Sequence, residues 1–185
     1  LCPRYCASLL IDVTVGPSPF WLRQRLEAVG FTPINNVVDV TNYVMMETGQ
    51  PLHAFDFDLL AQNRIEVKTV DAGTRFTTLD GKEHPLEAEM LMICDGEKPV
   101  AIAGVMGGEN SEISAGTTRV LIESAYFNPV SVRKTAKRTG IGTDASHRFE
   151  RGVDPAATKR VLERATVLMA DLSGASIAEG IIDEH

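Results

Sequence analysis

The sequence is poor in features that mark secreted, membrane-spanning or metal-binding proteins. Its cysteines, Cys2, Cys6 and Cys94, are odd in number and follow no metal-ligand spacing. The histidines are scattered, and no CxxC or HxxxH pair occurs, which argues against a zinc site. No apolar run approaches the roughly 20 residues of a membrane span, and no basic-plus-apolar leader is present. We therefore expect reduced, mostly buried thiols, no metal, no membrane association and a cytoplasmic location.

The chain also lacks the excess of basic residues that autonomous nucleic-acid binding requires. It carries 18 Lys and Arg against 25 Asp and Glu, a formal net charge of -7, whereas binding to nucleic acid depends on neutralising phosphates. The charge is uneven, because half of the basic residues lie between Arg133 and Arg164. We interpret that stretch either as solvated helix faces or as a local patch that touches RNA held in place by other domains.

Common catalytic motifs are absent as well. The segment 104–109 (GVMGGE) is rich in glycine but lacks the Lys-Ser/Thr pair of a P-loop. Ser146 and His147 are adjacent in sequence, which does not favour the facing geometry of a catalytic triad. A length of 185 residues fits one globular domain. The first residue is Leu1 rather than Met, so we interpret the chain as a piece of a longer polypeptide.

Helices and strands are mixed along the chain. The patterns predict helices from Pro19 to Gly30, Val37 to Thr48, Asn128-Pro129 to Gly140 and Asp154-Pro155 to just before Gly174, with Ser18 and Asn36 as N-caps. Strands are predicted at 6–13, 64–70, 76–79, 82–86, 91–94, 100–103 and 119–123. Because no regular βαβ alternation occurs, we expect an α+β fold with mixed sheets and helices packed outside, in a single compact domain over residues 1–185.

Four short segments hold more polar residues than a core requires. They are 35–42 (NNVVDVTN), 49–56 (GQPLHAFD), 104–109 (GVMGGE) and 143–152 (TDASHRFERG). A buried polar side chain costs free energy unless it is paired. Each segment therefore indicates either an internal hydrogen-bond network or a site that binds something.

Three side chains in these segments are suited to binding or hydrolysis. His53 stands among apolar residues and fits either a structural hydrogen bond or a group that orients or activates water. Thr41 and Asn42 fall inside a predicted helix, where neither has high propensity. Their hydroxyl and amide groups suit an ammonium group, a carbonyl or an attacking water, so we expect them at a site.

Glu123 lies at the end of an apolar strand. A carboxylate there is costly unless it is paired. We expect it either to form an ion pair with Arg119, Arg133 or Arg138, or to accept a hydrogen bond from a ligand hydroxyl.

The runs VVDVTNYV, GQPLHAFD and TDASHRFERGVDP, together with Cys2-Pro3-Arg4-Tyr5, resemble the central editing domain of the bacterial phenylalanyl-tRNA synthetase β chain. The similarity covers nearly the whole chain. It implies an α+β fold, hydrolysis of misacylated tyrosyl-tRNA(Phe) and no cofactor in this domain. The implied partners are the acceptor end of tRNA(Phe), tyrosine as the misactivated amino acid, the synthetase α subunit and the remaining β domains.

The resemblance also implies which residues form the site. The catalytic residues at the misacylated tRNA end would be Thr41, Asn42 and His53. The substrate-binding residues would be Gly107, Glu123, Thr143 and Ala145, with Glu123 accepting the para-hydroxyl of tyrosine and the small Ala145 leaving space for the ring. The identity of a general base stays open.

The sequence is also compatible with two other functions. The chain could be a structural and RNA-binding module of the same enzyme without hydrolytic activity. It could also be a free-standing aminoacyl-tRNA deacylase, although the missing initiator Met speaks against this version.

Overall fold

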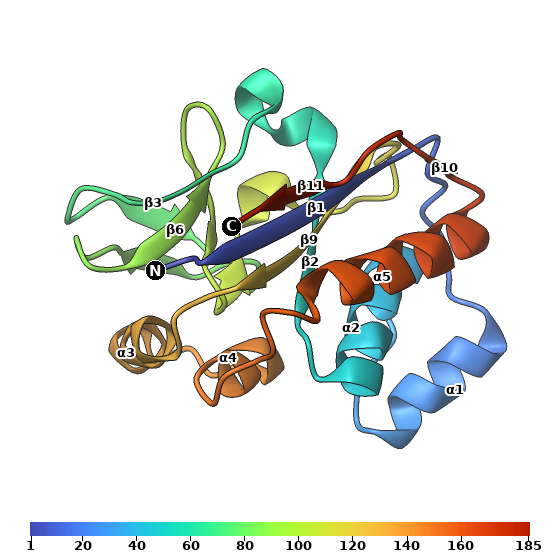
Figure 1. Cartoon of the computed structure of the whole chain (residues 1–185), viewed down its shortest axis with the longest axis horizontal. Coiled ribbons are helices and arrows are strands. Elements are labelled where there is room, and N and C mark those ends of the chain that lie inside the picture. The colour runs from blue at the N-terminus through green and yellow to red at the C-terminus, as the bar shows by residue number, and fades with distance from the viewer. The chain divides into compact units, whose positions relative to one another are not determined.

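Figure 1 shows the computed structural model of the chain, which describes residues 1–185. The chain divides into two compact units. Unit 1 consists of Leu1–Pro3, Phe57–Glu112 and Tyr126–Val153, and unit 2 of Arg4–Asp56, Ile113–Ala125 and Asp154–His185. Each unit is therefore assembled from segments that are distant in the sequence.

Unit 2 is a five-stranded sheet whose main strand order is β10-β1-β9-β2, with β11 also paired to β1. Helices α1, α2 and α5 accompany it (Figure 1). The strands are β1 (Arg4–Ile11), β2 (Leu52–Asp56), β9 (Val120–Tyr126), β10 (Ser176–Ile177) and β11 (Ile182–Glu184); the helices are α1 (Phe20–Ala28), α2 (Asn36–Thr48) and α5 (Thr158–Ser173).

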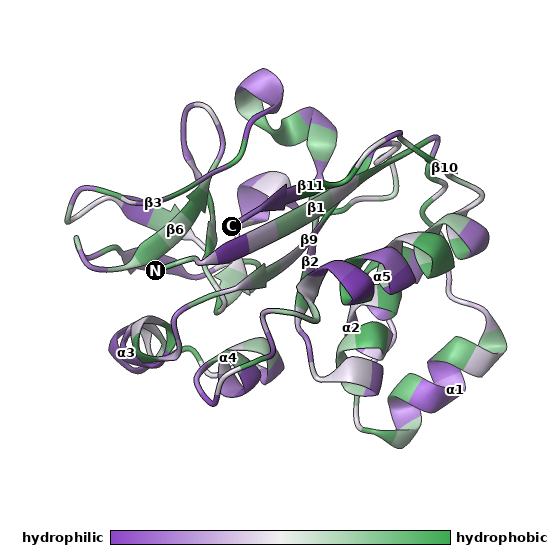
Figure 2. Ribbon diagram, in the orientation of Figure 1, coloured by the Kyte–Doolittle hydropathy of each residue, from purple (hydrophilic) through white to green (hydrophobic).

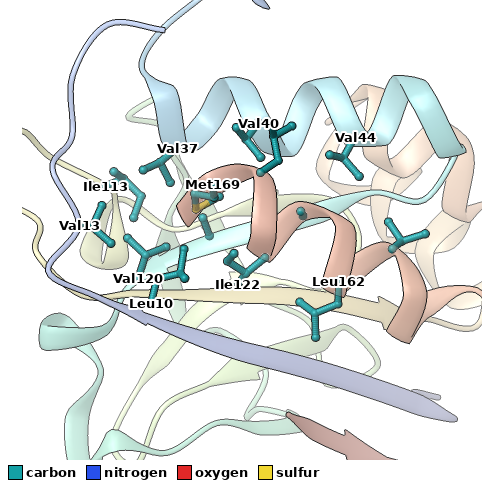
Figure 3. Close-up of a cluster of buried hydrophobic side chains, with 14 of the residues drawn as sticks. Leu10, Val13, Val37, Val40, Val44, Ile113, Val120, Ile122, Leu162 and Met169 are labelled. Atoms are coloured by element: carbon teal, nitrogen blue, oxygen red, sulfur yellow. The ribbon is translucent and has the colours of Figure 1, made fainter. Parts of the chain in front are cut away.

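The apolar core of unit 2 lies between one face of this sheet and the helices (Figure 3). Fully buried side chains from both layers pack together there, among them Leu10, Val40, Ile122, Leu162 and Met169. Alternation along each strand sends every second side chain to this face. Complete burial of each such aliphatic side chain stabilises the fold by about 1.5–3 kcal/mol, so this layer fixes the positions of β2 and β9.

The N-terminus of α2 differs from the prediction by one residue. Asn35 is the N-cap, and its side-chain oxygen accepts hydrogen bonds from two backbone N–H groups of the first turn, at 3.0 and 2.9 Å. Asn36, the predicted cap, is buried within that turn, where its amide donates to the carbonyls of Thr14 and Leu172. The helix ends at Gly49, as predicted, in a left-handed conformation with φ 80°.

The predicted N-cap of α1 was wrong for a related reason. Pro19 occupies the cap position, and the Ser18 hydroxyl instead donates to the buried Asp39 carboxylate at 2.6 Å. Asp39 also accepts from the backbone N–H of Ile34 at 2.8 Å. These bonds offset the cost of burying a carboxylate. The polar segment 35–42 is thus in part an internal network that joins α2 to the chain preceding α1.

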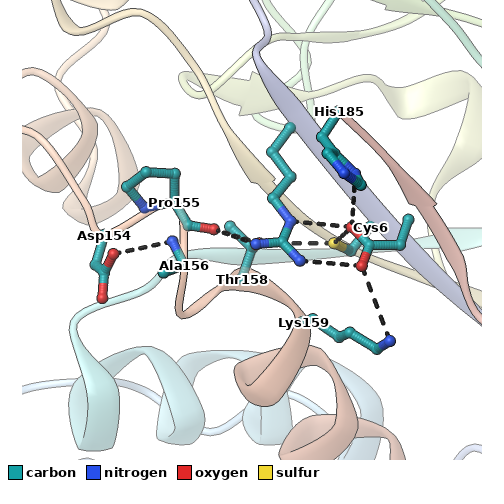
Figure 4. Close-up of polar contacts among 9 residues, drawn as sticks. Cys6, Asp154, Pro155, Ala156, Thr158, Lys159 and His185 are labelled. Carbon is teal, nitrogen blue, oxygen red and sulfur yellow. Dashed lines mark hydrogen bonds and ion pairs between the residues drawn. The ribbon is translucent and has the colours of Figure 1, made fainter.

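A second polar network ties β1 to β11 and to the chain entering α5 (Figure 4). Arg4 donates to both carboxylate oxygens of Asp183, at 2.9 and 3.0 Å, and to the carbonyl of Pro155 at 3.0 Å. The Cys6 thiol donates to Asp183 at 3.2 Å. The bonds from Arg4 hold the pKa of Asp183 at about 2, and burial raises the pKa of Cys6. Cys6 is therefore structural, and all three cysteines are free thiols.

Unit 1 contains a four-stranded antiparallel sheet of order β3-β6-β7-β8, a separate β4–β5 pair and two helices. Strand β6 is buried throughout, and its ribbon is hydrophobic along its length (Figure 2). The strands are β3 (Glu66–Thr69), β4 (Arg75–Thr77), β5 (Glu83–Pro85), β6 (Leu91–Cys94), β7 (Pro99–Ile102) and β8 (Met106–Gly107); the helices are α3 (Pro129–Thr139) and α4 (Asp144–Phe149), and short 3-10 turns lie at Phe57–Leu59, Ala61–Asn63 and Glu109–Ser111.

The predicted α+β class is confirmed, since the elements form mixed sheets with helices outside. The prediction missed β2, α4, β8, β10 and β11, which are short. It also began the last helix too early: α5 starts at Thr158, after a turn over 155–157. No helix of the structure combines the length and the apolar character that crossing a membrane requires.

Candidate active site

The register between β2 and β9 places His53 directly opposite Glu123. Opposed residues on antiparallel strands project to the same face, with Cβ atoms about 4.5–5.5 Å apart. The flanking residues Ala54 and Ile122 belong to the core of unit 2, so His53 and Glu123 lie on the other face of the sheet. Two predicted site residues from distant parts of the sequence are thus neighbours.

Glu123 is a buried carboxyl group without a charged partner. Its side chain forms no ion pair, and Arg138, one of the expected partners, instead binds Glu87 and Glu89. Only 5% of Glu123 is exposed, and its Oε2 has no hydrogen-bond partner in the protein. Burial raises the pKa of Glu123 to about 8, an effect that the influence of the Tyr5 hydroxyl of β1 offsets only in part. This shift favours the protonated, uncharged form of the carboxyl group near neutral pH.

His53 is an uncharged imidazole beside this carboxyl group. Its ring meets Phe55 edge-on, with centroids 4.5 Å apart and an interplanar angle of 81°. Burial lowers the pKa of His53 to about 4, so the ring is neutral near pH 7 and offers one donor and one acceptor nitrogen. The His53–Glu123 pair is therefore a polar site without net charge, which suits a neutral hydroxyl group or a water.

Thr41 and Asn42 lie on α2, which packs against β2. The Thr41 hydroxyl donates to the carbonyl of Val38 in its own helix at 2.7 Å. This local bond accounts for its presence in a helix, and its oxygen can still accept a hydrogen bond. Asn42 is half-buried on the same helix.

The other predicted site residues lie in unit 1. Thr143 is the N-cap of α4 and forms a reciprocal capping box with Ser146, at 3.0 and 2.9 Å. Its hydroxyl also donates to the carbonyl of Val105 at 2.8 Å, which fixes the start of α4 to the chain that enters β8 and Gly107. Ala145 is half-buried in the first turn of α4. The structure thus joins Thr143 and Ala145 with the strand that contains Gly107.

The predicted site residues are therefore divided: His53 and Glu123 are opposed in the unit 2 sheet, and Gly107, Thr143 and Ala145 lie in unit 1. Thr41 and Asn42 lie on α2, whose apolar side chains pack on the core face of the unit 2 sheet. The sequence analysis did not predict that Tyr5 is a neighbour of Glu123. It considered Tyr5 only as part of the segment 2–5 that carries the family resemblance. An aromatic hydroxyl within an apolar strand was the available signal, since such a group needs a partner when it is buried. No group of three or more His, Cys, Asp and Glu side chains is arranged to hold a metal ion.

The fold and the His53–Glu123 pair define the class of protein as an α+β domain with a polar site on one sheet face, formed by a half-buried His53 and a buried Glu123. The family model described as the B3/4 domain matches residues 1–174. The chain therefore belongs to the B3/4 domain family.

Curated relatives extend this assignment. The chain is 59% identical over 185 residues to the phenylalanine–tRNA ligase beta subunit of Syntrophus aciditrophicus and 58% identical to that of Geobacter sulfurreducens. In both cases 100% of the chain aligns, but it spans only 23% of the relative's length.

A solved structure has the same fold. The N-terminal fragment of the phenylalanyl-tRNA synthetase beta subunit from Pyrococcus horikoshii superposes with a TM-score of 0.55 at 11% identity, covering 97% of this chain and 49% of that one.

Proposed function

We propose that the chain is the editing domain of a phenylalanine–tRNA ligase β subunit and that it hydrolyses the ester of tyrosyl-tRNA(Phe). The observation that carries the proposal is the buried Glu123 carboxyl group, whose Oε2 lacks a partner in the protein. A buried carboxyl oxygen without a partner is suited to distinguish tyrosine from phenylalanine, because the ring hydroxyl can either donate or accept a hydrogen bond. The identity of 59% to a phenylalanine–tRNA ligase β subunit supports the assignment.

A ligase for phenylalanine needs a second, hydrolytic site because its apolar amino-acid pocket excludes tyrosine only weakly. An apolar pocket for phenylalanine rejects an added hydroxyl group only by about 10²-fold. A second site built around Glu123 reverses the preference, since tyrosine satisfies Oε2 whereas phenylalanine leaves it unpaired. The penalty for an unpaired buried group is about 1–3 kcal/mol.

Hydrolysis requires a water to be positioned against the reactive ester. His53 is suited to this task because its neutral ring can accept a hydrogen bond from water while remaining within the unit 2 site. In this proposal Thr41 and Asn42 of α2 contribute a hydroxyl oxygen and an amide group. Gly107, Thr143 and Ala145 take part in substrate binding in this proposal.

The proposed partners follow from the length of the relatives. The chain spans 23% of a β subunit, so the remaining β domains and an α subunit would charge tRNA(Phe) and deliver its acceptor end by tethering. The proposed location is the cytoplasm, where translation takes place.

Hydrolysis of tyrosyl-tRNA(Phe) by variants of the chain tests the proposal. We expect His53→Ala and Thr41→Ala each to slow deacylation by about tenfold or more, because positioning and proton-transfer groups typically contribute ~10²–10⁴-fold. The matched control is Thr48→Ala, since Thr48 lies on the same helix and its hydroxyl also donates to a backbone carbonyl, that of Val44, at 2.7 Å. This control should retain the wild-type rate.

The role of the predicted site residues of unit 1 (Gly107, Thr143 and Ala145) is tested in the same deacylation assay. Ala145→Trp should block deacylation while circular dichroism stays unchanged, and the control Ala61→Trp, at another half-buried alanine of unit 1, should not. Wild-type rates for His53→Ala and Thr41→Ala would remove the proposed water-positioning role. Absence of hydrolysis by the wild-type chain, alone or within its complete ligase, would favour the structural RNA-binding module instead.

A further inference from the structure

Helix α3 carries a concentration of positive charge in an acidic chain. The net charge of the chain is -7, yet residues 124–143 contain no Asp or Glu. Within this stretch α3 holds Arg133, Lys134, Lys137 and Arg138. Cations near the end of a helix interact favourably with its dipole, which accounts for Lys137 and Arg138. The helix dipole does not account for Arg133 and Lys134, which lie in the middle of α3.

Ion pairing separates these cations from others in the basic stretch. Arg138 binds Glu87 and Glu89 at 2.8 and 3.0 Å. Similar pairs neutralise further basic residues of the stretch: Arg148 with Asp144, Arg151 with Glu150, Lys159 with Asp183 and Arg164 with Glu47. By contrast, Arg133, Lys134 and Lys137 are exposed and make no ion pair. We call these three residues the α3 basic surface.

A hollow of about 370 Å³ adjoins this surface, between α3 and α4. Arg133 and Lys137, one helical turn apart, line it together with Gly140, Gly142 and His147. Glu150 is the acidic residue in the lining, and its carboxylate is bound to Arg151 at 2.7 Å. The positive charge facing the hollow therefore stays uncompensated.

We propose that the α3 basic surface binds the phosphodiester backbone of RNA. Side chains one helical turn apart have Cβ atoms about 5–6 Å apart, so Arg133 and Lys137 can reach neighbouring phosphates of one strand. Unpaired, exposed cations are the groups that release counterions from a phosphate chain without first losing an ion pair of their own. This inference rests on the proposed function, in which the RNA is the aminoacylated tRNA, and it narrows the broad basic stretch to the three unpaired cations of α3.

Binding of RNA by charge-matched variants tests the inference. The probe is a fluorescent RNA hairpin with an acceptor stem and a single-stranded 3′ end, followed by anisotropy from about 50 to 200 mM salt. Arg133→Ala/Lys137→Ala should weaken binding about tenfold at the lowest salt and reduce the slope of log K against log salt by about 2. The control is Arg23→Ala/Arg160→Ala, which removes two other exposed cations that make no ion pair.

RNA binding by the control variant and by the wild-type chain decides whether the inference holds. An equal loss in the control would attribute the effect to net charge and overturn the inference, as would failure of the wild-type chain to bind the hairpin at the lowest salt. A glutamate-rich peptide that binds the α3 basic surface more tightly than the RNA would show that the occupant is an acidic protein segment, which also overturns it.

Deacylation measured in parallel separates this inference from the proposed function. If tyrosyl-tRNA is hydrolysed and the α3 variant binds RNA like the control, the inference alone fails. If no hydrolysis occurs but binding depends on Arg133 and Lys137, the proposed function alone fails.

Discussion

Glu123→Ala should abolish the preference of the chain for tyrosyl-tRNA(Phe) over phenylalanyl-tRNA(Phe). The wild-type ratio of kcat/KM for the two esters is expected to be about 5- to 150-fold, since an unpaired buried acceptor costs about 1–3 kcal/mol. The substitution removes Oε2, which in the wild type is buried and lacks a partner in the protein. The ratio should fall to about one, as measured by release of amino acid from labelled tRNA.

Glu123→Gln is the matched control for this result. The amide has nearly the same size and keeps an acceptor oxygen, so it should retain part of the preference for tyrosine. Circular dichroism of both variants checks that the β2–β9 pair is intact. A full preference in Glu123→Ala would show that another group recognises the hydroxyl.

The pH dependence of stability should reveal the protonated state of Glu123. Burial raises its pKa from 4.5 to about 8 in the folded chain. Between these values the folded state holds a proton that the unfolded state has lost, so stability falls as pH rises. Relative to Glu123→Gln, the wild-type free energy of unfolding should decrease by about 1.4 kcal/mol per pH unit across this window. Urea denaturation at several pH values measures it.

His53 changes the free energy of unfolding with pH in the opposite direction to Glu123, and it does so at lower pH. Burial lowers its pKa from 6.5 to about 4, so its contribution is complete above pH 6.5 and is lost as pH falls toward 4. Above pH 6.5 the Glu123 effect therefore stands alone. Identical pH profiles for wild type and Glu123→Gln would contradict a buried, protonated carboxyl group.

Much of the fold could be predicted because helices and strands here follow local rules. Asn128 and Gly140 bound α3 as capping preferences require. Asn35 and Asn36 are equally good caps by sequence, and only tertiary bonds to Thr14 and Leu172 decide that Asn36 lies inside the helix. Ser18 was misassigned because its partner, Asp39, is distant in sequence.

The site could be predicted residue by residue but not as an arrangement. His53 and Glu123 could be chosen from the sequence because of the family resemblance and because burying a polar group is costly. Their pairing depends on the register between β9 and β2, a short strand that the sequence pattern did not predict. The role of Tyr5 depends on β1 lying beside β9, which is a property of the sheet rather than of any local segment. The bond from Thr41 to Val38 also shows that a polar residue in a helix does not by itself indicate a site.

Calorimetric titration of the wild-type chain with free tyrosine and free phenylalanine tests the central claim most directly. The claim is that the buried, unpartnered carboxyl group of Glu123 recognises a ring hydroxyl. Tyrosine should bind at least about tenfold more tightly than phenylalanine, a difference of about 1.4 kcal/mol. Equal affinities for the two amino acids would contradict the claim.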